Sequence, residues 1–136
     1  MKGVVLSGGT GSRLRPITFS MAKQLVPVAN KPILFYGLED LADAGITEVA
    51  IIIAPQTGDE IRRTVGSGSR FGLDIEYIVQ DEPLGLAHAL KTALPFVGGD
   101  DVLMYLGDNL VKQGVADVVK DFEKDKPNCQ ILLTKV

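Results

Sequence analysis

The sequence predicts an α/β fold, a three-layer Rossmann-like domain with a mostly parallel central sheet. Short apolar runs alternate along the chain with longer amphipathic stretches, and this alternation is typical of parallel strands joined by helices. The chain has 136 residues, of which 46% are hydrophobic and 23% are charged. That composition supports one hydrophobic core. We therefore expect residues 1–136 to form one domain.

The predicted strands are short runs rich in valine, isoleucine and leucine. They span residues 3–6, 48–53, 74–79, 101–105 and 130–135. The intervals between them carry apolar residues at helical spacing. Helices are predicted over residues 33–44, 58–65, 86–94 and 113–124. Pro32 at a first helical position opens the first helix and Gly45 stops it, while Pro95 closes the third. The glycine-rich segments 66–69 and 98–99 are predicted loops, too short to be domain linkers.

Composition and charge exclude several classes of partner. A net charge of −3 and an isoelectric point near 5.1 argue against nucleic acid or an anionic membrane. No apolar run approaches the length of a membrane span, and the N-terminus lacks a signal-peptide pattern. Cys129 is the single cysteine, so it cannot form an internal disulfide. We expect it to be a small buried apolar residue, and we expect the protein in the reducing cytoplasm.

A glycine-rich turn directly follows the first predicted strand. Gly8, Gly9 and Gly11 lack the side chains that would keep backbone N–H groups away from an anion. Arg13 adds a planar fork of donors, and Lys23 adds a mobile positive charge. The loop lacks the Gly-Lys-Ser/Thr ending of a Walker loop and the third glycine of the dinucleotide fingerprint. It predicts a polyphosphate site of another kind, and the alternative is a surface turn with incidental basic residues.

Further polar residues follow the third and fourth predicted strands. Because ligands of open parallel sheets bind outside the carboxyl ends of the strands, these segments should converge with the glycine turn on one crevice. Asp108 offers the hard carboxylate oxygen that magnesium prefers, or alternatively caps the next turn. Gln80 can read the edge of a nucleobase with its amide, and Gly85 would let the backbone approach that base. The alternative for both is a loop hydrogen bond and a helix-start glycine.

These motifs together resemble the sugar-1-phosphate nucleotidyltransferase family, and within it the glucose-1-phosphate thymidylyltransferases. The resemblance is carried by residues 8–14, 23–28, 31–32, Gln80 with residues 83–87, and residues 107–109. It covers essentially the whole sequence in order. Members of the family are much longer, so the chain resembles their N-terminal, nucleotide-binding half.

The resemblance implies transfer of a nucleotidyl group from dTTP to glucose 1-phosphate, giving dTDP-glucose and pyrophosphate, with Mg²⁺ as the cofactor. Arg13 and Lys23 would be catalytic, Asp108 would hold the metal, and Asn109 would reach the sugar side. The residues assigned to nucleotide binding are Gly8, Gly9, Gly11, Ser12, Arg13, Lys23, Gln24, Gln80 and Gly85. The resemblance also implies a homo-oligomer when the protein is full length.

Some positions depart from the family pattern. Leu84 stands where many short-form members carry aspartate, and Ser12 stands where threonine is usual, so UTP or another sugar 1-phosphate stays an alternative. In the family, a second metal-binding aspartate and the sugar-phosphate site lie in the C-terminal half. We therefore expect these 136 residues to bind nucleotide without turnover; a non-catalytic nucleotide-sensing module is the other alternative. His88 lies in an apolar helix without a nucleophile pattern, so we expect a structural or surface role for it.

Overall fold

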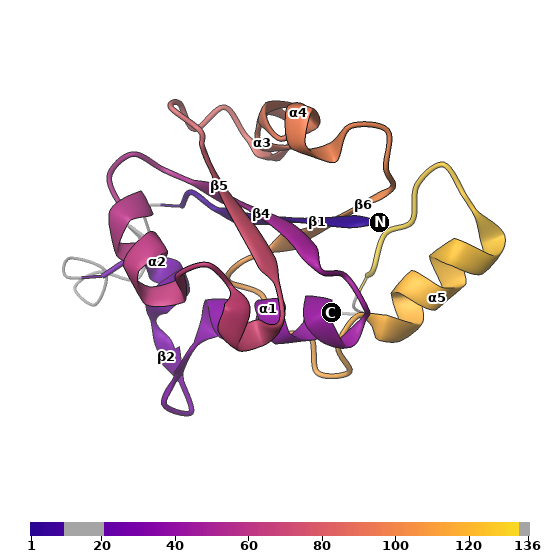
Figure 1. Ribbon diagram of the computed structural model, residues 1–136, viewed down its shortest axis with the longest axis horizontal. Helices are drawn as coiled ribbons and strands as arrows, with labels where there is room; N and C mark the ends of the chain where they lie inside the picture. The colour runs from indigo at the N-terminus through magenta and orange to yellow at the C-terminus, as the bar shows by residue number, and fades with distance from the viewer. Residues whose placement is uncertain (10–20, 134–136) are drawn as a thin grey trace.

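A four-stranded parallel sheet forms the centre of the computed structural model, which describes residues 1–9 and 21–133 (Figure 1). Its strands are β1 (Lys2–Ser7), β4 (Glu48–Ile53), β5 (Asp74–Val79) and β6 (Val102–Leu106). They are arranged in the order β5-β4-β1-β6. In this order β1 is interior, and its Val4 lies opposite Ala50 on one side and Met104 on the other. The predicted α/β class with a parallel sheet is confirmed.

The two interior strands are apolar along almost their whole length because helices cover both of their faces. In β1, Val4 and Val5 point to opposite faces and both are completely buried. In β4, Ile51 and Ile52 are likewise buried. Alternate residues of each strand therefore supply two separate cores, one above and one below the sheet.

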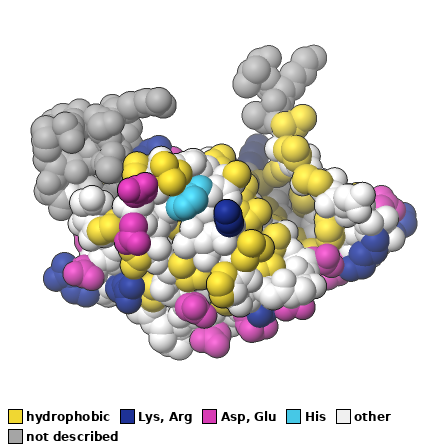
Figure 2. All heavy atoms as spheres, turned by 90° about the horizontal axis from the view of Figure 1, so that it is seen from above, with side chains coloured by type: hydrophobic (Ala, Val, Ile, Leu, Met, Phe, Trp, Pro, Cys, Tyr) yellow, Lys and Arg dark blue, Asp and Glu magenta, His cyan; other side chains and the backbone are white. Residues whose placement is uncertain are grey.

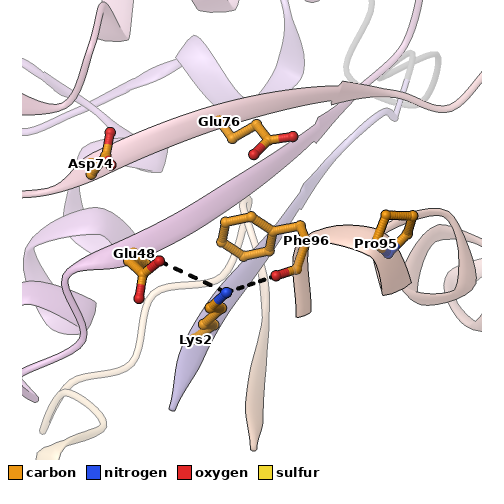
Figure 3. A pocket seen from close by; sticks show the side chains of 6 residues that line it. All are labelled: Lys2, Glu48, Asp74, Glu76, Pro95 and Phe96. Atoms are coloured by element: carbon orange, nitrogen blue, oxygen red, sulfur yellow. Dashed lines mark hydrogen bonds and ion pairs between the residues drawn. The ribbon is translucent and has the colours of Figure 1, made fainter. Parts of the chain in front are cut away.

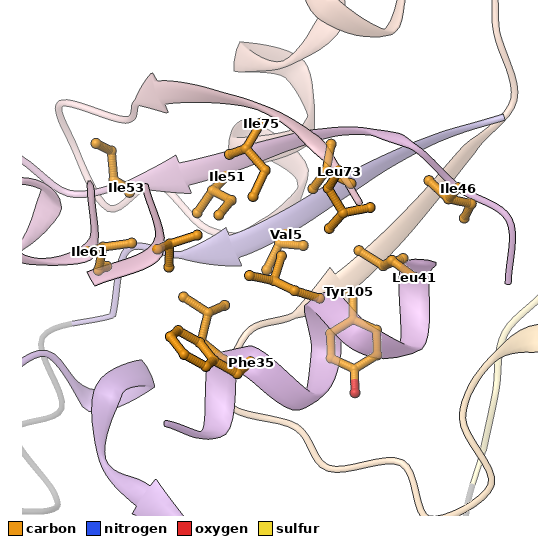
Figure 4. Close-up of a cluster of buried hydrophobic side chains, with 14 of the residues drawn as sticks. Val5, Phe35, Leu41, Ile46, Ile51, Ile53, Ile61, Leu73, Ile75 and Tyr105 are labelled. Atoms are coloured by element: carbon orange, nitrogen blue, oxygen red, sulfur yellow. The ribbon is translucent and has the colours of Figure 1, made fainter. Parts of the chain in front are cut away.

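Helices α1 (Ile33–Asp43) and α2 (Gly58–Val65) cover one face of the sheet, and α3 (Leu86–Thr92) and α4 (Leu94–Val97) cover the other (Figure 1). The larger core lies under α1, where Phe35 and Leu41 pack against Val5 and Ile51 (Figure 4). Helix α5 (Ala116–Asp125) adds Val119 to it. The smaller core contains Val4, Leu6, Ile52, Ala89, Ala93 and Val97.

Helix α1 approaches β6 closely at Gly37. A Cβ atom on Gly37 would lie 2.6 Å from Cε1 of Tyr105, so only glycine permits this spacing. The Tyr105 hydroxyl donates a hydrogen bond to Oδ2 of Asp40, at 3.1 Å. Burial, together with the Asp40 carboxylate, raises the pKa of Tyr105 above its usual range. Burial also raises the pKa of Asp40, against the opposing hydrogen bond from Tyr105.

Several short elements were not predicted. A 3₁₀ turn, η3 (Lys23–Leu25), precedes a small hairpin of β2 (Pro27–Val28) and β3 (Lys31–Pro32), and η4 (Ser69–Phe71) is another 3₁₀ turn. The hairpin turn has φ of 49° at Ala29 and 64° at Asn30, as a two-residue turn of type I′ requires. Pro32 therefore ends a strand and precedes α1; it is not a first helical residue.

Two further predictions about elements are corrected. Pro95 does not close the third helix but lies near the start of α4, where a proline costs no hydrogen bond. Residues 130–133, the described part of the strand predicted over 130–135, are not a strand, and Leu133 is 83% exposed. An apolar run becomes a strand only where a neighbour satisfies its backbone groups. Cys129, in the same segment, is exposed and not buried.

Across the described residues, the helices are too short or too polar to traverse a lipid bilayer.

Candidate functional site

The strand order creates a crevice where β1 and β6 end. After β1 the chain first adds β4 and β5 on one side of this strand, and it then adds β6 on the other side. Open α/β sheets bind ligands at such a point, where the strand order reverses. The two strand ends are joined directly, because the Gly107 amide donates to the Leu6 carbonyl at 2.9 Å. A cavity of about 330 Å³ opens at this place.

The cavity brings together residues from segments that are far apart in the sequence. Its apolar floor contains Leu6 of β1, Ile52 of β4 and Leu106 of β6, with Ala89 of α3. The predicted site residues that line it are Gly8, Gly9, Lys23, Gln24, Gln80, Gly85 and Asp108. The glycine turn, the residues after β5 and the residues after β6 therefore converge, as the sequence predicts.

Lys23 and Asp108 form an ion pair through Nζ and Oδ2. The Lys23 side chain is 34% exposed and that of Asp108 is 30% exposed, so both can be reached from the cavity. A single carboxylate together with substrate phosphates and waters is a usual way for proteins to hold Mg²⁺. The described residues contain no group of three or more histidine, cysteine or acidic side chains that could hold a metal by themselves. Asp108 therefore fits a metal that arrives with phosphate.

The amide of Gln80 has two partners near the start of α3. Its Nε2 donates to the Gly85 carbonyl at 3.3 Å and lies 2.9 Å from Nδ1 of His88. Gly85 itself has φ of +95°, which favours glycine at this N-cap. A Cβ atom on Gly8 would lie 3.7 Å from Oε1 of Gln80, so the amide oxygen faces the glycine turn.

Gln24 is held inside the same corner. The residue is 3% exposed, and its Oε1 has no hydrogen-bond partner among the described residues. A Cβ atom on Gly9 would lie 3.4 Å from Nε2 of Gln24. A buried unpaired acceptor is costly, and Gln24 carries this cost among the residues that line the cavity.

Not every predicted residue lies at the cavity. Gly11, Ser12 and Arg13 lie outside the described residues. Asn109 is exposed in the turn after β6 and does not line the cavity; its carbonyl accepts from the Tyr105 hydroxyl at 3.3 Å. The sequence interpretation also missed the contact of His88 with Gln80. The signal was present, because His88 follows Gly85 by three positions in the first turn of the helix.

A second hollow, of about 280 Å³, lies at the amino ends of the strands (Figure 3). Lys2 Nζ donates to the Phe96 carbonyl at 2.8 Å and lies 3.8 Å from Oε1 of Glu48. Two more carboxylates, Asp74 and Glu76, line this hollow. The predicted site residues lie at the other end of the sheet, where the strands finish.

Comparison with known proteins finds a matching family model and relatives of high sequence identity. The nucleotidyl transferase family model matches residues 2–136. The low-salt glycan biosynthesis nucleotidyltransferase Agl11 of Haloferax volcanii is 57% identical over 136 residues, and a glucose-1-phosphate thymidylyltransferase of Streptomyces griseus is 56% identical. Both matches cover 100% of this chain and 38% of the relative. The chain thus spans well under half the length of these relatives.

Solved structures show the same fold. A Bacillus anthracis structure described as a glucose-1-phosphate thymidylyltransferase in complex with sucrose matches with a TM-score of 0.88 and 38% identity, covering 93% of this chain and 51% of that one. A UDP-glucose pyrophosphorylase complexed with UDP-glucose matches with a TM-score of 0.77 and 21% identity, covering 92% of this chain and 54% of that one. The second likeness concerns the fold alone.

Proposed function

The chain belongs to the nucleotidyl transferase family, and from this premise we propose that it forms the nucleotide-binding domain of a glucose-1-phosphate thymidylyltransferase. The reaction is the transfer of the nucleotidyl group of dTTP to glucose 1-phosphate. The observation that carries the proposal is that Gly8 and Gly9, Gln80 and the Lys23–Asp108 pair line one cavity. The name of the Streptomyces griseus relative supports the choice of substrates.

The chemistry needs positioning and charge neutralisation, without a covalent intermediate on the protein. A phosphate oxygen of the sugar 1-phosphate bonds to the α-phosphorus, and the bond from that phosphorus to the pyrophosphate oxygen breaks. Backbone N–H groups of Gly8 and Gly9 bind the triphosphate from the β1 end. Lys23 contacts phosphate oxygens, and Arg13 stabilises the departing pyrophosphate. In this scheme Asn109 contributes on the sugar side.

Magnesium, held by Asp108, would neutralise phosphate charge when it is bound. Without substrate, Asp108 is neutralised by Lys23. When the nucleotide enters, Lys23 transfers its contact from the carboxylate to a phosphate oxygen, which frees Asp108 for the metal. The ion pair thus holds the Lys23 ammonium and the Asp108 carboxylate at the cavity before the phosphate and the metal are bound.

The nucleotide base lies against Gln80 and Gly85 in this proposal. Leu84, one of the two positions that depart from the family pattern, is 61% exposed and does not line the cavity, so its side chain does not read the base there. Uracil presents the same N3–H as thymine, and UTP therefore stays the second candidate nucleotide. A homo-oligomer and a cytoplasmic location also stay predictions.

Pyrophosphate release by the intact protein tests the proposal. We expect release from dTTP that depends on both glucose 1-phosphate and Mg²⁺, and slower release from UTP. Binding of dTTP without any turnover by the intact protein would instead support a nucleotide-sensing module.

In the variant Gln80→Ala, binding of dTTP should lose its advantage over the purine nucleotides while the triphosphate contacts are retained. Unchanged selectivity across the four nucleotides would reject base reading by Gln80.

A further inference from the structure

We propose that His88 is a positioning residue that fixes the orientation of the Gln80 amide, so that Gln80 presents its oxygen, and not its NH₂ group, to the base. The inference rests on the proposed function, because it concerns how the same cavity distinguishes nucleobases. Its basis is the pair of contacts at Nε2 of Gln80, 3.3 Å to the Gly85 carbonyl and 2.9 Å to Nδ1 of His88.

The Gly85 carbonyl shows which end of the Gln80 amide is the NH₂ group and which is the oxygen. A carbonyl oxygen only accepts hydrogen bonds, so the amide group that faces it must be the NH₂ group. His88 Nδ1 lies beside this same NH₂ group. It must therefore accept, which requires a neutral ring that carries its proton on Nε2. Both hydrogens of the Gln80 amide are then used inside the protein.

The remaining end of the amide faces the cavity. Oε1 of Gln80 is 3.7 Å from the position that a Cβ atom of Gly8 would occupy, and both residues line the cavity. No side chain at Gly8 separates this oxygen from an incoming base. The described geometry thus offers one acceptor, with its donors directed away from the ligand.

The histidine is supported by a well-packed helix. It lies in the first turn of α3, and Ala89 of this helix and Ala93 at its C-cap are buried at 3% and 0% exposure. The Thr92 hydroxyl donates to the His88 carbonyl at 2.9 Å. Figure 2, which looks onto the face covered by α3 and α4, shows the histidine side chain at the surface beside hydrophobic side chains. A ring held on a packed helix can orient a neighbouring amide.

An acceptor without a nearby donor selects for one type of pyrimidine. Thymine and uracil carry a hydrogen on N3, which Oε1 of Gln80 can accept. Cytosine has a lone pair at N3, so two acceptors would face each other and one would be left unpaired. An amide that was free to turn would present its NH₂ group to cytosine and would lose this discrimination. The predicted role of His88 is therefore selectivity between dTTP and dCTP.

The test compares the dissociation constants of dTTP and dCTP for the intact protein by calorimetry, in one buffer that contains Mg²⁺. The ratio of the two constants is the readout, because the triphosphate contacts are common to both nucleotides. His88→Ala should lower the preference for dTTP by about tenfold, the value of one well-formed hydrogen bond. His88→Asn should retain most of it, because an asparagine oxygen can replace Nδ1 as acceptor. Circular dichroism establishes that each variant is folded.

The double variant His88→Ala with Gln80→Ala shows whether the histidine acts through the glutamine. If it does, the double variant discriminates no worse than Gln80→Ala alone. An additive loss, an unchanged ratio in His88→Ala, or equal losses in the alanine and asparagine variants would each overturn the proposal. If the unaltered protein binds no dTTP, the proposed function fails. If it binds dTTP selectively and His88→Ala is as selective, only this inference fails.

Discussion

Replacing Asp108 by asparagine separates a metal ligand from a merely structural partner of Lys23. Within residues 1–9 and 21–133 the carboxylate has one charged contact, Nζ of Lys23, and both side chains are about one-third exposed, at 30% and 34%. An ion pair with this exposure contributes about 1 kcal/mol or less to stability. We therefore expect Asp108→Asn to change the free energy of unfolding by no more than that amount.

Nucleotide binding should respond differently in the presence and absence of magnesium. With Mg²⁺, the variant loses a negative ligand to a hard cation, and we expect dTTP binding to weaken by at least about tenfold. Without Mg²⁺, the variant lacks a carboxylate that repels the triphosphate and leaves Lys23 unpaired. Binding of metal-free dTTP should then be unchanged or tighter. A loss of dTTP binding that appears only with Mg²⁺ could not come from a general loss of folding, which would weaken binding under both conditions.

Isothermal titration with dTTP, with Mg²⁺ and with a chelator, measures both effects. Asp101→Asn is the matched control, because Asp101 precedes β6 at its other end and pairs with Lys126 at 3.0 Å, far from the cavity. The control should bind dTTP as the unaltered protein does under both conditions. Equal weakening of Asp108→Asn with and without Mg²⁺ would refute the metal assignment and leave Asp108 with a structural role.

The remaining predictions concern catalysis and stability. Arg13→Ala should lower the catalytic constant of the intact enzyme by at least about a hundredfold, because a charge-assisted donor acts chiefly in the transition state. Steady-state kinetics measures this constant, and near-normal turnover would show that Arg13 is a surface-loop residue without a catalytic role. Gly37→Ala should destabilise the protein by about 1–2 kcal/mol, because crowding against Tyr105 exceeds the gain in helix propensity, and urea unfolding that shows a gain would contradict this. Asp40→Asn should raise stability at neutral pH, because it removes a charge whose burial is unfavourable. The raised pKa of Asp40 means that its ionised form is disfavoured in the folded state, so the gain should shrink as the pH falls toward the ordinary aspartate value; a gain that grows on acidification would refute it.

The interior of the sheet could be predicted because its signals are local and continuous. The run at β4 coincides with the predicted range because it is apolar and bounded by turn residues. The edge strand β5 also coincides with its predicted range, although its sequence includes Asp74 and Glu76. The β2–β3 hairpin was missed because its strands are two residues long, too short for any periodicity. The strand predicted over 130–135 was wrong for its described part, because strand formation depends on a neighbour that a local pattern cannot reveal.

The cavity was predicted in outline and not in detail. Residues that follow the carboxyl ends of parallel strands must lie at one edge, so the convergence of Gly8, Gln80 and Asp108 followed from topology. The contact of Gln80 with His88 depends on how α3 lies across the sheet, and packing decides that. Asn109 belongs to the predicted motif, but it does not line the cavity, and its backbone carbonyl accepts a hydrogen bond from Tyr105.

The pairing of β1 with β6 also sets the order in which the protein can assemble. Every residue of β1 in this ladder pairs with one that lies 100 positions later in the chain, and such distant pairing makes folding slow. During synthesis, β1, β4 and β5 can associate as soon as they emerge from the ribosome, whereas Asp108 joins them only after β6 has been made. Until then one edge of β1 exposes unpaired backbone groups, which is a hazard for aggregation. The cavity is therefore completed in a late step of folding, and substitutions along the β1–β6 ladder should delay the appearance of nucleotide binding more than the appearance of helix.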